Sequence, residues 1–208
     1  MTELIGVYGA GGCGRGILPI VREQYLNTKI VFIDDGYRGG VLNGHTVMTW
    51  ADFRVVEDLE KAVCIAIANS GVRETLAQMC DNEDIPLIEA RHPTVLQMDD
   101  VDIADGACLS PFVTMTSNIR IGRGFHANLY SYVEHDCHIG DFVTFAPSVK
   151  CNGNVTIGDR AYIGAGAVIR QGLTIGASAV IGMGAVVTRD VPSGVTVVGN
   201  PARPLIKG

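Results

Sequence analysis

An apolar residue recurs at every sixth position over almost half of this chain. The fifteen positions that follow this interval from Ile103 to Val187 are all apolar. Four residues after each of them, fourteen of fifteen positions are again apolar, and the exception is Ser131. A helix cannot keep a strict period of six, and hairpins have loops of varying length. The pattern therefore indicates one structural unit per six residues, and each unit buries its apolar face only against its neighbours.

This sequence resembles the hexapeptide repeat of left-handed parallel β-helices over Ile103–Val191. The resemblance implies a triangular prism with three hexads per coil and about five coils, in which the first residue of each hexad points toward the axis. Glycine directly follows that residue at positions 122, 140, 158, 164, 176 and 182. We expect these glycines to lie at the corners of the prism, where glycine adopts a positive φ at little cost.

The first ninety residues alternate between apolar runs and helical stripes. We expect strands at Leu4–Tyr8, Lys29–Ile33, Val63–Ile67 and Pro86–Ile88, and helices at Ile17–Tyr25 and Ser70–Cys80. This order is typical of βαβ units around a parallel sheet. The length suffices for one half of a dinucleotide-binding fold. The predicted organisation is an α/β Rossmann-like half domain over residues 1–91, then an all-β left-handed β-helix with a short tail over 92–208.

Composition excludes several classes of function. The net charge of −6 argues against a nucleic-acid-binding protein, which usually carries a basic face. No apolar run reaches the roughly 18 residues of a membrane span, and the start of the chain lacks a signal peptide. The six cysteines show neither CxxC spacing nor the density of a disulfide scaffold. We therefore expect a cytoplasmic protein with reduced thiols, no membrane insertion and no metal site.

The order of the parts narrows the resemblance. A Rossmann-like half domain, the His92-Pro93 junction, the prism and the closing segment Val198-Gly199-Asn200-Pro201-Ala202-Arg203 resemble NeuD/PglD-type sugar acetyltransferases over essentially the whole chain. The resemblance implies a homotrimer with active sites between neighbouring prisms. It also implies transfer of an acetyl group from acetyl-CoA to a nucleotide-linked 4-amino-4,6-dideoxy sugar, in the synthesis of a surface glycan such as an O-antigen.

Acyl transfer from a thioester needs a base that removes a proton as the acceptor attacks. His135 is the third residue of its hexad, where side chains face outward, and Asp136 follows it. The resemblance implies that His135 is the general base, and Asp136 would hold the imidazole in one tautomer. His138 also faces outward and competes for this role. His126 is expected either to contact a neighbouring chain or to lie on the surface.

Three further residues are candidates for the reaction centre. Cys137 stands beside the histidine, as a nucleophile would, but its inward position in the hexad favours a small core residue and direct acyl transfer. The resemblance places Asn128 near the acceptor sugar. Gly153 is expected either to offer its backbone N–H to the developing oxyanion or to be an ordinary corner glycine.

Acetyl-CoA is expected in the groove between two prisms, where its pantetheine arm bonds to the main chain. The resemblance assigns these contacts to Thr144, Gly164, Ala165, Gly182 and Met183.

The segment Gly9-Ala10-Gly11-Gly12-Cys13-Gly14 matches GxGxxG, and Asp34 lies about 20 residues further on. Such a loop presents backbone N–H groups and a helix N-terminus to a phosphate. The motif alone suggests NAD(P), although the second half of that fold is missing. The resemblance instead implies a site for a nucleotide-linked sugar. Gly11, Gly12 and Cys13 of the loop would contact the sugar or the diphosphate, and Asp34 and Asp35 would contact the nucleoside. Ala68 and Asn69 would lie at the strand end beside the nucleoside.

Two other functions are left open. One is O-acetylation of a free sugar such as sialic acid. The other is a binding module, in which the first domain senses a nucleotide and the prism only assembles the trimer. Outward apolar residues of the prism, Leu129, Phe142 and Tyr162, favour a homotrimer in either case.

Overall fold

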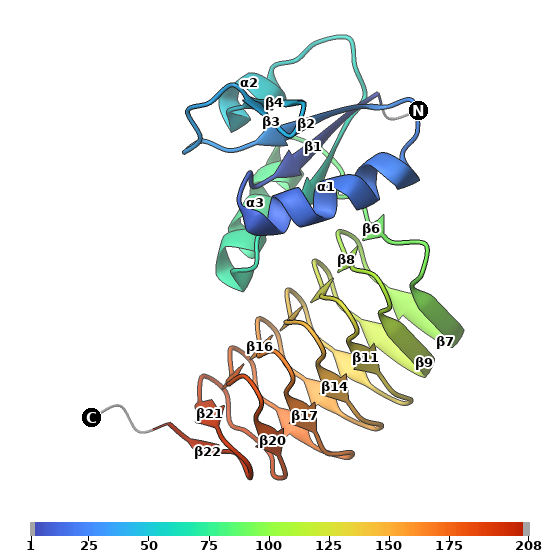
Figure 1. The fold of residues 1–208 in the computed structure, drawn as a ribbon, viewed down its shortest axis with the longest axis vertical. Helices are drawn as coiled ribbons and strands as arrows, with labels where there is room; N and C mark the ends of the chain where they lie inside the picture. Colours follow the sequence, from blue (N-terminus) through green and yellow to red (C-terminus); the bar gives the residue numbers. More distant parts are fainter. Residues whose placement is uncertain (1–2, 206–208) are drawn as a thin grey trace.

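The first domain of the computed structural model, which describes residues 3–205, is a five-stranded sheet with three helices (Figure 1). The strands follow the order β3-β4-β2-β1-β5, and all neighbours are parallel except β3 and β4. Their bounds are β1 Leu4–Tyr8, β2 Lys29–Ile33, β3 Val41–Leu42, β4 His45–Met48 and β5 Lys61–Ile65. The expected strand at 86–88 is reduced to a single parallel bridge between Leu87 and Val63.

The helices are α1 Gly12–Gln24, α2 Trp50–Arg54 and α3 Ser70–Asn82. Helix α1 begins inside the glycine-rich segment and is thus longer than its apolar stripe predicts. Helix α3 begins after Asn69, whose side chain accepts the N–H of Val72 and satisfies one of the free donors of the first turn. The β3–β4 hairpin and α2 were not expected, because neither is long enough for a periodic pattern.

The second domain is the expected prism of short parallel strands. Strands inside the prism pair in parallel with the strands one coil before and after them, whereas β21 and β22 at its end are antiparallel to each other. Tyr132, for example, faces Thr114 on one side and Lys150 on the other, eighteen residues apart in each direction. The strands are β6 Ala90–Arg91, β7 Leu96–Ile103, β8 Cys108–Leu109, β9 Thr114–Ile121, β10 His126–Ala127, β11 Tyr132–Val133, β12 His138–Ile139, β13 Thr144–Phe145, β14 Lys150–Cys151, β15 Thr156–Ile157, β16 Tyr162–Ile163, β17 Val168–Ile169, β18 Thr174–Ile175, β19 Val180–Ile181, β20 Val186–Val187, β21 Thr196–Val198 and β22 Arg203–Pro204.

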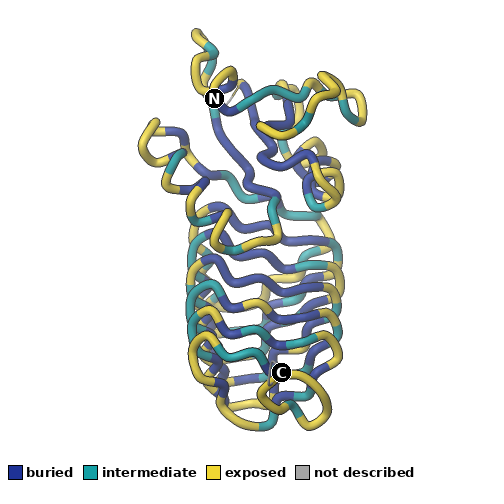
Figure 2. Tube along the Cα trace, turned by 90° about the vertical axis from the view of Figure 1, so that its left-hand side faces the viewer, coloured by how far each residue is buried: buried dark blue, intermediate teal, exposed yellow. Residues whose placement is uncertain are grey.

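The core of the prism consists of the two apolar positions of each hexad, which form a continuous buried column (Figure 2). The polar exception, Ser131, is buried as well, but its hydroxyl donates to the carbonyl of Ala146 and accepts the N–H of Val149. A buried hydroxyl with two partners is tolerated in an apolar core. None of the helices within residues 3–205 has both the length and the apolar character of a membrane span.

The glycines that follow the inward residues do not have the positive φ that was expected of them at the corners of the prism. A positive φ occurs three residues after the inward position, at residues such as Asn118, Asp136 and Arg160. The glycines at 122, 140, 158, 164, 176 and 182 do not adopt it. A Cβ at Gly158 would lie 2.6 Å from the backbone nitrogen of Ala177 in the next coil. These glycines are therefore required for the close approach of successive coils.

The two domains meet through a buried arginine of α3. Arg73 is 1% exposed and donates six hydrogen bonds, all to neutral oxygens. Three of its acceptors are the prism carbonyls of Gly124, Phe142 and Val143, and a fourth is the hydroxyl of Thr144. Burial lowers the pKa of Arg73 to about 10, so that it keeps its charge at neutral pH.

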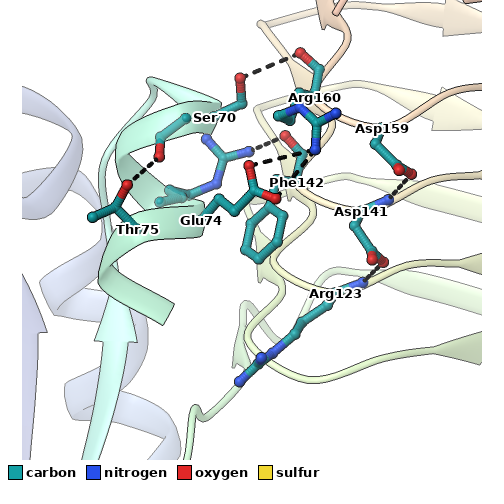
Figure 3. A network of polar contacts seen from close by, with 10 residues as sticks. Ser70, Glu74, Thr75, Arg123, Asp141, Phe142, Asp159 and Arg160 are labelled. Carbon is teal, nitrogen blue, oxygen red and sulfur yellow. Dashed lines mark hydrogen bonds and ion pairs between the residues drawn. The ribbon is translucent and has the colours of Figure 1, made fainter. Parts of the chain in front are cut away.

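Polar pairs surround this joint, as Figure 3 shows for α3 and the facing turns of the prism. Glu74 and Arg160 form an ion pair at 3.1 Å, and the hydroxyl of Ser70 donates to the carbonyl of Arg160. Phe142 is only 6% exposed and packs into the core of the first domain. Its expected role on the outer surface is therefore wrong, whereas Leu129 and Tyr162 are exposed as expected.

We expect Arg73→Ala to lower the free energy of unfolding by about 3 kcal/mol or more, because several buried carbonyl oxygens lose their donor together. Urea denaturation followed by circular dichroism measures this change. Arg54→Ala is the control, since Arg54 pairs with Glu83 on the surface, and its loss should cost less than about 1 kcal/mol. Equal losses for both variants would contradict a structural role of the buried arginine.

Candidate active site

His135 and Asp136 lie in the turn between β11 and β12. This turn belongs to the edge of the prism that also includes segment 116–119 of β9 and the turns 152–155 and 170–173, which we call the His135 edge. The imidazole Nδ1 lies 2.7 Å from Oδ2 of Asp136, and both side chains are more than half exposed. The hydrogen bond with Asp136 raises the pKa of His135, and the pKa of Asp136 is lowered in turn. The pair thus has the arrangement of a base and its orienting carboxylate.

The imidazole lines a hollow of about 500 Å³ together with Gly153, Asn154 and Gln171. It lies over Gly153 of the next coil, where a Cβ would be only 2.5 Å from Nε2. The missing side chain therefore leaves space for the ring. The N–H of Gly153 donates to Oε2 of Glu134 at 3.1 Å, so a role toward an oxyanion requires Glu134 to release it first.

The other histidines of the prism lie elsewhere. His138 is exposed on a flat face, where it lines a separate hollow with Arg120 and Asp141. His126 is 3% exposed, and its Nε2 lies 2.9 Å from the carbonyl oxygen of Ile65 in the first domain. Its expected place on the surface or at a neighbouring chain is therefore wrong, because His126 belongs to the joint between the domains.

Cys137 points into the prism, as its hexad position predicts. Its thiol donates to the carbonyl of Asn152 at 3.3 Å and accepts the N–H of Val155 at 3.4 Å. It is fully buried, so a substrate that enters the hollow at His135 does not reach it. This placement favours direct acyl transfer over a covalent thioester on the protein.

The glycine-rich loop has the local geometry of a phosphate-binding turn. Gly9 has a φ of 107°, and a Cβ on Gly14 would overlap the carbonyl oxygen of Gly9. Gly11 is the N-cap of α1, and open space surrounds both Gly11 and Gly12. The N-terminus of a 13-residue helix is therefore accessible at this loop, with its free N–H groups.

The two aspartates beside the loop are already engaged within the domain. Asp34 accepts the N–H of Ala10 at 2.9 Å and thereby holds the glycine-rich loop. Asp35 accepts the Tyr8 hydroxyl and the N–H of Trp50, both at 2.9 Å. Burial and the contact with Asp35 raise the pKa of Tyr8. Any contact of these carboxylates with a nucleoside thus has to use the remaining lone pairs.

A third hollow, of about 300 Å³, lies where α1 meets the prism. It brings together Cys13 and Ile17 of α1 with His92, Ser110 and Asn128. Burial raises the pKa of the Cys13 thiol to about 11, so this group is neutral there. Asn128 belongs to the edge of turns 110–113, 128–131, 146–149, 164–167 and 182–185, called the Asn128 edge below. The structure therefore joins Asn128 to the glycine-rich loop, but not to His135, which is on another edge of the same prism.

The residues expected to contact CoA divide into two groups. Gly164, Ala165, Gly182 and Met183 lie in successive turns of the Asn128 edge, and Met183 is 83% exposed. Thr144 is 2% exposed, and its hydroxyl donates to the carbonyl of Ala68 while it accepts from Arg73. Because the joint covers Thr144, its hydroxyl has no open side for CoA. Ala68 itself is exposed, and its carbonyl accepts from Arg73 as well.

One polar contact at the site was not expected from the sequence. The amide Nδ2 of Asn118 donates to Oδ1 of Asp136 at 3.1 Å. Asn118 precedes Asp136 by eighteen residues, and the same interval separates the paired residues of successive coils from β6 to β20. The eighteen-residue period therefore indicated that Asn118 lies beside Asp136, although no sequence motif pointed to Asn118.

Comparisons with known proteins agree with this architecture. The family model of the PglD N-terminal domain matches residues 4–80, and the bacterial transferase hexapeptide model matches residues 154–189. A GDP-perosamine N-acetyltransferase of Escherichia coli O157:H7 is 48% identical over 213 residues, which cover 98% of this chain and 96% of that protein.

Two solved structures are similar over nearly the whole chain. WeeI from Acinetobacter baumannii AYE is 52% identical, with a TM-score of 0.95 over 98% of this chain and 100% of that one. The acetyltransferase domain of PglB from Neisseria gonorrhoeae FA1090, in complex with acetyl coenzyme A, is 28% identical, with a TM-score of 0.90 over 99% of this chain and 100% of that one.

The fold and the site thus define a hexapeptide-repeat acyltransferase with a Rossmann-like N-terminal domain. The chain belongs to the PglD-type family of sugar acetyltransferases. The expected family, fold class and enzyme class are confirmed by these matches.

We expect Asp136→Asn to lower the pKa of His135 toward its ordinary value near 6.5, because the variant removes the charge that favours the imidazolium form. An NMR titration of the imidazole measures the pKa, and His135→Ala identifies the signal. Glu134→Gln is the control, since Glu134 adds a neighbouring negative charge without a hydrogen bond to the ring. It should lower the pKa less, and an equal or larger effect would contradict the assigned pair.

Proposed function

We propose that this enzyme transfers the acetyl group of acetyl-CoA to the amino group of a nucleotide-linked 4-amino-4,6-dideoxy sugar, in the synthesis of a surface glycan. The observation that carries the proposal is the His135–Asp136 pair, with its 2.7 Å hydrogen bond at the mouth of an open hollow. The relative named for GDP-perosamine supports a sugar of this class and favours GDP as its nucleotide. The complex of PglB with acetyl coenzyme A supports the donor.

In this mechanism, the neutral imidazole acts as the general base. Nε2 of His135 removes a proton from the amino group as its nitrogen attacks the thioester carbonyl, while Asp136 holds Nδ1–H and stabilises the imidazolium that forms. The tetrahedral intermediate then collapses, the C–S bond breaks, and the proton passes to the leaving thiolate. The N–H of Gly153 stabilises the oxyanion once Glu134 has released it.

The first domain would bind the nucleotide part of the acceptor. The accessible N-terminus of α1 at Gly11 and Gly12 suits a diphosphate, and Asp34 with Asp35 would contact the nucleoside. The hollow with Cys13 and Asn128 would then receive the sugar. In this division, residues 1–91 bind the sugar nucleotide and residues 92–208 carry the acetyl transfer. Within residues 3–205 the sheet contains only one mononucleotide-binding half, which disfavours NAD(P).

The active site would be completed by a neighbouring chain in a homotrimer. The sugar hollow and His135 lie on different edges of one prism, so the base of one chain would meet the hollow of the next. Phe112 and Tyr130 form a stacked pair on the Asn128 edge, with ring centroids 4.9 Å apart, and they are 49% and 62% exposed. Both occupy the corner position, where the repeat adopts a positive φ, so it is their exposed apolar surface that supports a function for this pair in assembly.

His135→Ala should lower kcat by about 10²- to 10⁴-fold, because a positioned base is lost, and it should leave the Kd of acetyl-CoA within a few-fold. Thiol release with a panel of GDP-, UDP- and dTDP-linked amino sugars and free sialic acid measures the activity. His138→Ala is the control and should retain activity. If His138→Ala is inactive and His135→Ala is active, the base is wrongly assigned. Acetylation of sialic acid alone would favour the O-acetyltransferase, and no turnover at all would favour the binding module.

The mass in solution should be three times 22.1 kDa, as measured by light scattering at micromolar concentration. Tyr130→Asp should weaken the trimer, because it places a charge in the proposed apolar contact. Leu26→Asp is the control, since Leu26 is 74% exposed on the first domain and does not belong to the stacked pair. A monomer in the native protein would exclude both the trimer and a shared active site.

A further inference from the structure

The His135 edge carries a column of residues at the same corner position in successive coils. Asn118, Asp136 and Asn154 have φ values of 56°, 60° and 56°, and Gly172 continues the column with 74°. Backbone hydrogen bonds link the coils here, since the N–H of Asp136 donates to the carbonyl of Ser117. The main chain therefore fixes where the Asp136 side chain starts, but not how its carboxylate is turned.

Two contacts determine the orientation of that carboxylate. Oδ2 faces Nδ1 of His135 at 2.7 Å, and Oδ1 accepts Nδ2 of Asn118 at 3.1 Å. Each oxygen thus has one side-chain partner, and the two partners come from neighbouring coils. Because Asp136 is about half exposed, water competes for both oxygens. A second anchor on Oδ1 reduces the freedom of the carboxylate to turn away from the imidazole.

The corner geometry alone does not explain an asparagine at position 118. Glycine adopts a positive φ at lower cost than asparagine and occupies this corner position elsewhere, for example at 106, 124 and 172. Asparagine is tolerated in the left-handed region better than most residues, and it adds a donor that glycine lacks. Its amide reaches one coil further along the prism, to the carboxylate beside the base.

Among the described contacts, Asp136 is the charged group that bonds to the imidazole of His135. The titratable groups that affect His135 are Asp136, Glu134 and Cys137, all from its own turn. The carboxylate of Glu134 is bonded to the N–H of Gly153. The residues of the next coils around the hollow are Gly153, Asn154, Gln171 and Gly172, which are uncharged.

We propose that Asn118 is a positioning residue, which holds the Asp136 carboxylate in the plane that orients His135 for proton removal. This inference rests on the proposed function of His135 as the base. Asn118 contacts neither the imidazole nor the hollow in which the reaction would take place. It acts on the base only through Asp136, so its loss should change the properties of the imidazole without preventing substrate binding.

The test is Asn118→Gly, which removes the amide and also relieves the positive φ, so the variant has no reason to misfold. We expect kcat to fall roughly tenfold, less than the 10²- to 10⁴-fold of losing the base itself. The KM of acetyl-CoA should change little. The acid limb of the kcat/KM profile should move to lower pH, because a less well-held carboxylate favours the imidazolium less. The NMR titration of His135 should show the same fall of its pKa.

Two further variants complete the experiment. Asn118→Asp keeps the shape but replaces the donor by a carboxylate that repels Asp136, so its kcat should fall at least as far. Ser178→Gly is the matched control, because Ser178 has the same corner position and a φ of 56° on another edge. It should retain the kcat and the pH profile of the native enzyme.

The outcomes separate this inference from the function on which it rests. If His135→Ala is inactive but Asn118→Gly keeps the native kcat and pH profile, the positioning role is excluded and the base remains assigned. A fall of kcat with an unchanged pH profile and an unchanged pKa of His135 would also exclude it, since a merely structural role gives that result. If His135→Ala is active, the proposed function itself fails.

Discussion

The structure depends on the register of one coil over the next. Because each coil from β6 to β20 takes eighteen residues without insertion, a residue there lies over the one eighteen positions before it, and the last coil is shorter, at sixteen. This constraint places Asn118 beside Asp136 and Gly153 above the ring of His135. One inserted residue between these positions would separate the carboxylate from its second anchor and the imidazole from the space over Gly153. The geometry of the proposed reaction centre is thus a consequence of the repeat.

The second constraint is the joint made by Arg73. A guanidinium with six neutral acceptors attaches α3 to the prism and sets the position of the whole first domain. That position brings the glycine-rich loop and Cys13 next to Asn128. The joint also covers Thr144 and Phe142, which the prism alone would expose. The proposed nucleotide site and the proposed sugar hollow are therefore placed next to each other by contacts between the two domains.

Much of the candidate site could be predicted from the hexad pattern, since it gives the direction of each side chain. The outward direction of His135 and Asp136 and the inward direction of Cys137 are confirmed. The pattern failed where the two domains touch. His126 occupies an outward position of its hexad, but Ile65 of the first domain covers it. The corner glycines were misread for another reason, because the close approach of coils, rather than φ, requires them.

The sequence alone determined the prism, the half-size first domain and the outward direction of His135 beside Asp136. These features follow from local periods and spacings, because side-chain direction repeats with the backbone. Tertiary structure alone decided which outward residues stay exposed, which carboxylates are already engaged, and that His135 and Asn128 lie on different edges. Those facts depend on contacts between segments up to ninety residues apart, such as Ser70 with Arg160. A period within one segment contains no information about the surface that another segment covers.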